Sequence, residues 1–111
     1  MQLYTVRPVL GYSEIVWALR QVVRRRRSSA WATVKATVEG YEFLAARQNG
    51  WLVVFYSYEV AGEVYSGELR EWLMLRYPGD EEPISDAISR FPRGSQINVC
   101  VDPRHPARSV G

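Results

Sequence analysis

The stretch that most constrains the fold is Trp51–Arg70, whose pattern predicts two long strands joined by a tight turn at Ala61-Gly62. The alternation of side chains continues after the turn as far as Leu69. One face of the first strand is expected to carry Leu52, Val54, Tyr56, Tyr58 and Val60. Because a two-stranded hairpin is at best marginally stable alone, other segments of the chain must cover its apolar face.

Two further segments alternate in the same way and predict strands. The first runs from Trp31 through Phe43, and the second is Gln96–Val101. A short final strand is expected at Ala107–Val110, and Leu69–Leu75 fits either a continued strand or a helical turn.

Two connections are predicted from turn residues. Ala46–Gly50 is expected to be a loop, because Asn49-Gly50 supplies residues that tolerate positive φ. Asp102–Pro106 is expected to be a rigid turn that the Asp102 carboxylate closes.

Two helices are predicted from periodicity and end signals. The first spans residues 14–27 after a Ser13 cap, and its apolar residues recur at the spacing of one helix face. The second spans residues 83–91, with Asp80 or Glu81 as its cap and Pro83 in its first turn. Its inward face is expected to hold Ile84, Ala87, Ile88 and Phe91.

These elements predict an α+β fold. We expect an antiparallel four- to five-stranded curled sheet, or a small partly open barrel, with a helix at 83–91 and an N-terminal amphipathic helix at 14–27. A chain of 111 residues is long enough for one core. Residues 1–30 are expected to form an N-terminal arm and the basic helix, and residues 31–111 the sheet domain. A short strand is the alternative to an arm for residues 1–11.

Charge is unevenly distributed along the chain. The net charge is +2, but residues 1–30 hold six arginines and one glutamate, whereas residues 31–111 hold eight basic and eleven acidic residues. The sheet domain is therefore acidic, which does not favour a basic nucleic-acid-binding face on it. The longest candidate for a membrane span, residues 15–23, is interrupted by Arg20 and is shorter than the ~20 apolar residues that a span requires.

Several short motifs follow one another between Trp31 and Val110. They are Val34 and Val38, the strand Val54–Tyr58, Gly62, Tyr65, Gly67, Phe91-Pro92-x-Gly94 and Asp102-Pro103-x-x-Pro106. In this order they resemble the bacterial family of domains of unknown function numbered 3592 in the DUF series. The resemblance implies a small antiparallel sheet domain, commonly attached to membrane helices, and carries over no catalytic residue or ligand. A short helix ending in arginine is predicted here in place of a flanking membrane helix.

Residues suited to catalysis or metal binding are few. Cys100 and His105 are the one cysteine and the one histidine, and zinc takes about four ligands, so we expect neither a metal site nor a cofactor. Glu81, Glu82 and Asp86 fit a paired-carboxylate acid/base site, but acidic residues are also expected at a helix start because of the helix dipole. No phosphate loop, nucleophile elbow or triad spacing is evident, so we do not expect an enzyme.

Two groups of residues are candidates for binding. Tyr56, Tyr58 and Tyr65 would form a stacking platform for bases or sugars, or belong to the core and its rim. The first helix ends in Arg24, Arg25, Arg26 and Arg27. This cluster suits an anionic membrane surface, a protein partner or nucleic acid, and it also suits the negative end of the dipole of a core-packed helix.

We therefore expect a non-catalytic binding or regulatory module, a protein-interaction domain of a membrane-associated assembly. The alternative is single-stranded nucleic-acid binding through the curled sheet and Arg24–Arg27. The expected partner is a protein or a second copy of the chain, followed by peripheral contact with a membrane, with nucleic acid the weaker alternative. The expected location is the cytoplasm, with contact at the inner membrane as a variant of it.

Overall fold

The computed structural model describes residues 3–8 and 31–111. The elements in these ranges are β1 (Thr5–Pro8), β2 (Ala32–Ala46), β3 (Asn49–Val60), β4 (Glu63–Met74), α2 (Glu82–Ser89), β5 (Gln96–Asp102) and β6 (His105–Val110). The predicted helix at 14–27, with its four arginines, lies outside the described residues. β1 belongs to the segment that was expected to form either a short strand or an arm, and it is a strand that pairs with β2 as part of the sheet.

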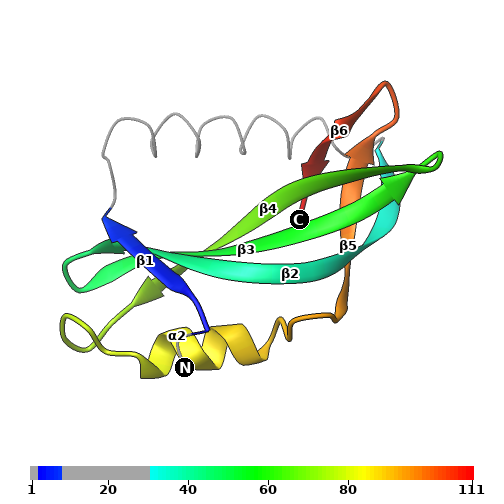
Figure 1. Ribbon diagram of the computed structural model, residues 1–111. Coiled ribbons are helices and arrows are strands. Elements are labelled where there is room, and N and C mark those ends of the chain that lie inside the picture. The colour runs from blue at the N-terminus through cyan, green and yellow to red at the C-terminus, as the bar shows by residue number, and fades with distance from the viewer. Residues whose placement is uncertain (1–2, 9–30) are drawn as a thin grey trace.

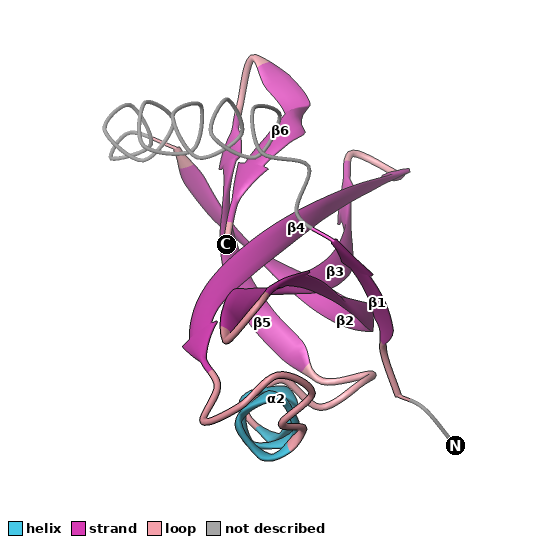
Figure 2. Ribbon diagram, turned by 90° about the vertical axis from the view of Figure 1, so that its left-hand side faces the viewer, coloured by secondary structure: helices cyan, strands magenta, loops and turns pink. Residues whose placement is uncertain are grey.

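Five strands curl into a nearly closed barrel in the order β4-β3-β2-β5-β6, with antiparallel pairing between hydrogen-bonded neighbours. Figure 1 shows the long strands β2, β3 and β4 running across the molecule, and Figure 2 shows α2 end-on beneath them. The prediction of a curled sheet or partly open barrel with one helix in its second half is confirmed. The helix α2 lies between the third and fourth of these five strands in chain order.

The two outer strands meet at a contact that we call the seam, formed by Gly67–Leu69 of β4 and residues 109–111 at the end of the chain. A Cβ atom placed on Gly67 would lie 2.6 Å from Ser109 Oγ, and one placed on Gly111 would lie 2.7 Å from Leu69 Cβ. The absence of side chains at these two glycines is what lets the outer strands approach so closely.

β2 joins the two parts of the sheet. One of its edges pairs with β3, and the other pairs with β5 at residues 32–37 and with β1 at residues 42–45. The β2–β3 register shifts between Val38 and Gly40, so Glu39 opposes no residue of β3 and forms a bulge. The bulge moves the inward-facing positions from even numbers, ending at Val38, to odd numbers, starting at Tyr41. Arg93 Nε donates a hydrogen bond to the Glu39 carbonyl at 2.7 Å and holds the bulge in place.

The barrel interior divides into two apolar clusters. The helix-end cluster consists of Val38, Tyr41, Phe43, Leu52, Val54, Leu73, Leu75, Ile84, Ala87 and Ile88. The seam-end cluster consists of Ala36, Tyr56, Tyr58, Val99 and Val101. Leu69 and Ile97 pack against both clusters. β3 supplies side chains to both clusters from alternate positions, as its sequence pattern predicts.

The helix α2 closes one end of the barrel. It was predicted at 83–91 and is found at Glu82–Ser89, a difference of one or two residues at each end. Its proline lies in the first turn, where a missing N–H costs no helical hydrogen bond, and Ile84, Ala87 and Ile88 are buried against the sheet. The helix thus covers the apolar face that the strands leave exposed at this end.

The turns confirm two predictions and correct one. Ala61 and Gly62 have φ angles of 52° and 83° and form the predicted tight turn of the β3–β4 hairpin. Asp102 Oδ1 accepts a hydrogen bond from the Arg104 backbone N–H at 2.9 Å, as expected of a carboxylate that closes a turn. The turn is shorter than the predicted Asp102–Pro106, because β6 begins at His105 and not at Ala107. The predicted loop at Ala46–Gly50 is wrong, because the strands run on to Ala46 and from Asn49 and leave a two-residue turn.

The reason for this correction lies in packing. The residue with positive φ in the β2–β3 turn is Arg47, at 49°. Gly50 lies within β3 instead, where an added Cβ atom would be 2.3 Å from the Leu44 carbonyl oxygen and 2.6 Å from Phe43 Cζ. This glycine is required by the close approach of its neighbours and not by its φ angle. Leu69–Leu75, which fitted either a strand or a helical turn, continues β4 as far as Met74.

Candidate functional site

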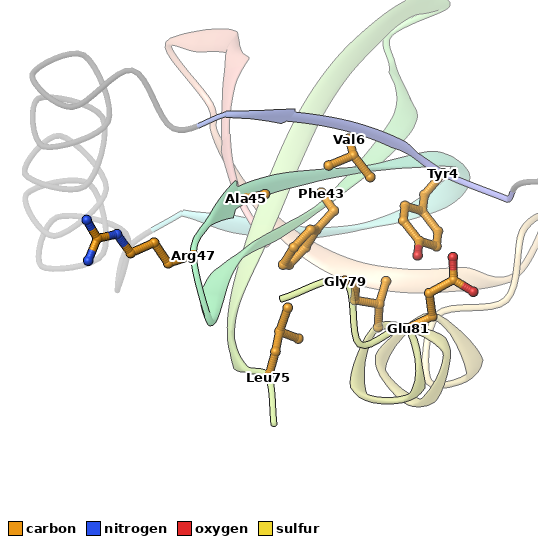
Figure 3. A pocket seen from close by; sticks show the side chains of 9 residues that line it. Tyr4, Val6, Phe43, Ala45, Arg47, Leu75, Gly79 and Glu81 are labelled. Carbon is orange, nitrogen blue, oxygen red and sulfur yellow. The ribbon is translucent and has the colours of Figure 1, made fainter. Parts of the chain in front are cut away.

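The candidate site lies beside β1, where two cavities separate the N-terminal segment from α2. The first cavity has a volume of about 190 Å³ and opens between β1, β2 and the loop that precedes α2 (Figure 3). Its walls are formed by Tyr4, Val6, Phe43, Ala45, Arg47, Leu75, Gly79, Glu81 and Ile84. Phe43, Leu75 and Val6 face its centre, whereas the Arg47 side chain extends away from the others (Figure 3). The cavity is therefore apolar inside, with charged groups at its rim.

The second cavity has a volume of about 420 Å³ and lies further along α2. It is lined by Leu3, Tyr41, Ser85, Ile88, Ser89, Pro92 and Arg93. Leu3 is 66% exposed, so an apolar side chain at the edge of this hollow is open to solvent. Because both cavities have α2 on one side and residues 3–6 on the other, we call them together the β1–α2 groove.

The position of β1 follows from its short alternating pattern and one ion pair. Val6 lies opposite Phe43 in the parallel β1–β2 register, and Tyr4 and Val6 both line the first cavity. Arg7 lies on the other face, where its guanidinium forms an ion pair with Glu42 of β2. Apolar contact on one face and charge on the other therefore hold this strand on the edge of β2.

The wall of the groove next to α2 is fixed by a network of charged residues. Arg76 Nε donates to Asp80 Oδ2 at 2.8 Å, and Arg76 Nη2 donates to Glu82 Oε2 at 2.6 Å. Asp80 is only 1% exposed, and its Oδ1 also accepts the Glu82 backbone N–H at 3.3 Å. The hydrogen bond from Arg76 outweighs burial and lowers the pKa of Asp80 to about 2. Asp80 is therefore ionised at neutral pH and ties the end of β4 to the start of α2.

Two tyrosines of the groove have altered acidities. Burial raises the pKa of Tyr4, and the nearby Glu81 carboxylate raises it further, in agreement with the Tyr4 hydroxyl pointing toward Glu81 in Figure 3. Burial also raises the pKa of Tyr41, whose hydroxyl donates to the Phe91 carbonyl. Both hydroxyls stay protonated at neutral pH and act there as hydrogen-bond donors.

The three tyrosines predicted to form a stacking platform do lie together. Tyr58 and Tyr65 are opposite each other on β3 and β4 with ring centroids 5.7 Å apart, and Tyr56 and Tyr58 are 6.0 Å apart. However, Tyr56 is only 1% exposed and Tyr58 only 3%. The structure thus places two of the three rings inside the barrel, where a base or sugar does not reach their faces.

The hydroxyl groups of the buried tyrosines reach across to β6. Tyr56 Oη and Ser109 Oγ are 2.7 Å apart, and Tyr58 Oη donates to the Pro106 carbonyl at 2.6 Å. The Tyr56 ring passes close beneath Gly67, whose hypothetical Cβ would lie 2.7 Å from its Cζ atom. These tyrosines therefore link β3 to the last strand and hold the seam.

The other residues singled out in the sequence are dispersed. Arg24–Arg27 lie outside the described residues. Glu82 pairs with Arg76, Glu81 occupies the N-cap position of α2 and lines the groove, and Asp86 offers its carbonyl to Ser89 Oγ. Cys100 lies on β5 and His105 begins β6. In residues 3–8 and 31–111, no three His, Cys, Asp or Glu side chains come together in a way that would hold a metal ion.

The groove residues were not recognised in the sequence. Tyr4, Phe43, Leu75 and Ile84 come from four separate segments, so no local motif connects them. The signal that was available is the alternation of Tyr4, Val6 and Pro8, which is typical of a short strand with one apolar face.

Residues 13–110 match the family DUF3592, described as a domain of unknown function, and the chain belongs to this family. No curated protein and no solved structure shows a significant match to it. Within the described part of the chain, no helix has the length and apolar character needed to cross a membrane.

Proposed function

We propose that this chain is a non-catalytic protein-interaction module and that the β1–α2 groove is where it receives its partner. The observation that carries the proposal is the apolar hollow on both parts of the groove, about 190 Å³ and 420 Å³, which the residues around it leave unfilled. Apolar pockets with a charged rim are the usual anchor sites for side chains of a binding partner.

A protein partner is favoured because both cavities of the groove lie between α2 and the N-terminal segment that contains β1. The groove is lined by residues before α2, within it and after it, and offers aliphatic and aromatic walls with Arg93 and Glu81 at its margins. A chain that lay along it would bury apolar side chains at intervals and leave its polar groups at the rim.

A cytoplasmic position beside the inner membrane is the setting we propose for this module. The support is the sequence pattern of residues 14–27, whose apolar stripe and Arg24–Arg27 suit an anionic lipid surface. Co-sedimentation with vesicles containing anionic lipid is expected, and it should fall strongly in neutral vesicles and in a chain with Arg24–Arg27 replaced by alanine. Equal sedimentation in all three cases would refute this setting.

The groove is tested by site-specific photo-crosslinking in cells that produce the protein. A photoreactive residue at Ser89 should give one discrete adduct on a denaturing gel, because Ser89 lines the second cavity. The matched control is the same residue at Arg104, in the turn between β5 and β6 and distant from α2 in Figure 1. The adduct should disappear when Ile88→Asp places a charge in the groove. An adduct of equal yield from Arg104, or none from Ser89, would contradict the proposal.

A second candidate function is single-stranded nucleic-acid binding, which one observation favours. The outer face of β3 and β4 carries Phe55, which is 37% exposed, and Trp72, which is 44% exposed. Trp72 packs edge to face against Trp51 with ring centroids 4.9 Å apart. Exposed aromatic residues on this face are where OB-fold barrels stack bases. Fluorescence anisotropy with a labelled single-stranded oligonucleotide at low salt tests this function. If the chain binds the oligonucleotide through this face, binding should be lost in Trp72→Ala and should weaken with added salt.

A further inference from the structure

β1 occupies the edge of β2 in the way that a bound peptide would. It is four residues long, all four are exposed, and it pairs in parallel, the arrangement that is slightly less stable per residue. Residues 9–31 separate it from β2 in the sequence. Among the described residues, the strand is held by pairing with β2, by Tyr4 and Val6 beside the first cavity and by the Arg7–Glu42 ion pair, and another extended chain is able to make contacts of each of these kinds.

The resident strand also fills its site incompletely. Val6 lies beside Phe43 and lines the first cavity, yet about 190 Å³ remains open there. A closed apolar cavity of about 150 Å³ is enough to hold a benzene ring. A side chain larger than valine at this position would enter the hollow and gain the contacts that the resident strand does not make.

From these two observations we propose that residues 42–45 of β2 form a strand-accepting site, and that an extended segment of a partner protein exchanges with β1 there. The proposal rests on the proposed function, because it assigns the partner to the same groove. β1 then acts as an internal competitor that lowers the apparent affinity for the partner in proportion to the time it is bound.

The contacts of β1 define the chemistry of the segment that would replace it. Its backbone would run parallel to β2 at the register of Thr5 to Pro8. An aromatic residue would take the place of Tyr4, a leucine or phenylalanine that of Val6, and a basic residue that of Arg7, opposite the Glu42 carboxylate. Main-chain pairing would supply affinity, while the cavity and Glu42 would supply selectivity.

The probe is a fluorescein-labelled peptide with the sequence of residues 3–8, Leu-Tyr-Thr-Val-Arg-Pro, and a second peptide in which leucine replaces the valine. Both are titrated with the full-length chain and with a full-length Val6→Asp/Arg7→Glu variant, whose own strand is repelled by the apolar cavity and by Glu42. The variant should bind the first peptide at least tenfold more tightly than the unaltered chain. The leucine peptide should bind either protein more tightly than the valine peptide.

Charge reversal at Glu42 locates the site. In a Val6→Asp chain that keeps Arg7, Glu42→Arg should lower the affinity for the arginine peptide about tenfold and raise it for a peptide with glutamate at that position. Glu59→Arg, a charge reversal at an exposed position on β3, is the control and should change neither affinity. Circular dichroism and urea unfolding of each variant establish that the barrel is intact, and the comparison of the two peptides on the unaltered chain needs no variant at all.

Three results would overturn strand exchange. One is equal peptide affinity for the unaltered and weakened chains, and another is binding that Glu42→Arg leaves unchanged. The third is a dimer that forms only when a chain carrying Arg7→Glu is mixed with a chain carrying Glu42→Arg. In that case β1 of one copy would occupy the site on β2 of the other. A Ser89 crosslink that persists while the peptides fail would keep the interaction module and remove strand exchange alone.

Discussion

Replacing Gly67 with alanine should open the seam between β4 and β6. The added Cβ atom would lie 2.6 Å from Ser109 Oγ and 2.7 Å from both Cζ and Oη of Tyr56. Distances this short are not sustained between real atoms, so the Tyr56 ring, the Ser109 side chain or the β4 backbone must move. Any of these movements separates Tyr56 Oη from Ser109 Oγ, which are now 2.7 Å apart in a buried position.

The size of the effect follows from two contributions. Inserting a methyl group into a well-packed interior costs about 1–3 kcal/mol, and losing a buried hydrogen bond costs about 0.5–1.5 kcal/mol. The free energy of unfolding should therefore fall by about 1.5–4.5 kcal/mol. For a domain of this size, the melting temperature changes by about 4 °C for each kcal/mol, so a fall of at least about 6 °C is expected.

Urea unfolding, followed by tryptophan fluorescence and circular dichroism, measures this difference. Gly40→Ala is the matched control, since an added Cβ atom there meets no atom within 4 Å and the glycine has no positive φ. This variant should be neutral or slightly more stable, because alanine restricts the unfolded chain. Tyr56→Phe should reduce the cost of Gly67→Ala when the two are combined, because the hydroxyl that meets the new methyl group is gone.

The reasoning would be refuted if Gly67→Ala were as stable as Gly40→Ala. It would also be refuted if Gly67→Ala and Tyr56→Phe had strictly additive effects, since the two changes act on atoms that touch.

Three further predictions concern stability. The free energy of unfolding should decrease as the pH is lowered from about 4 to about 2, because the pKa of Asp80 is 3.8 in the unfolded chain and about 2 in the folded one, so the unfolded chain binds the proton first. Asp80→Asn should flatten this part of the pH profile measured by urea unfolding. Gly50→Ala should lower the free energy of unfolding by about 2–3 kcal/mol in thermal melts, because its Cβ atom would lie 2.3 Å from a backbone oxygen, and a neutral result would contradict the packing argument. Tyr58→Phe should cost about 1 kcal/mol by leaving the Pro106 carbonyl without its donor, and an unchanged urea midpoint would show that water replaces the hydroxyl.

The strands of the barrel were predictable because each has one face toward the interior. Alternation along residues 51–60 marks the inward positions directly, and the spacing of Ile84, Ala87 and Ile88 marks the buried face of α2 in the same way. The turn at Ala61-Gly62 was predictable too, since a two-residue hairpin turn of this kind requires positive φ at both positions. These are local properties that a sequence displays without knowledge of distant contacts.

The remaining features depend on contacts between segments far apart in the chain. Asn49-Gly50 tolerates positive φ, but Gly50 is needed for close packing against Leu44, which no local pattern reveals. The three tyrosines were correctly grouped, but whether their rings are accessible depends on Pro106 and Ser109 in the last strand. The β1–α2 groove likewise exists only after β1 has paired with a strand more than thirty positions later in the sequence.

The division of the interior into a helix-end cluster and a seam-end cluster gives the barrel two units of local stability. Among the described residues, Leu69 and Ile97 are the two that pack against both clusters, so the coupling between the two ends passes largely through these side chains and through the backbones of β2 and β3. Amide hydrogen exchange should therefore show two groups of protected amides with different opening free energies. Replacement of β1 by a partner strand beside α2 would change the protection of the amides around the helix-end cluster. The amides around Tyr56 and Tyr58 in the seam-end cluster would keep their protection. Substitution of Leu69 or Ile97 would therefore change how strongly one end of the barrel responds to events at the other.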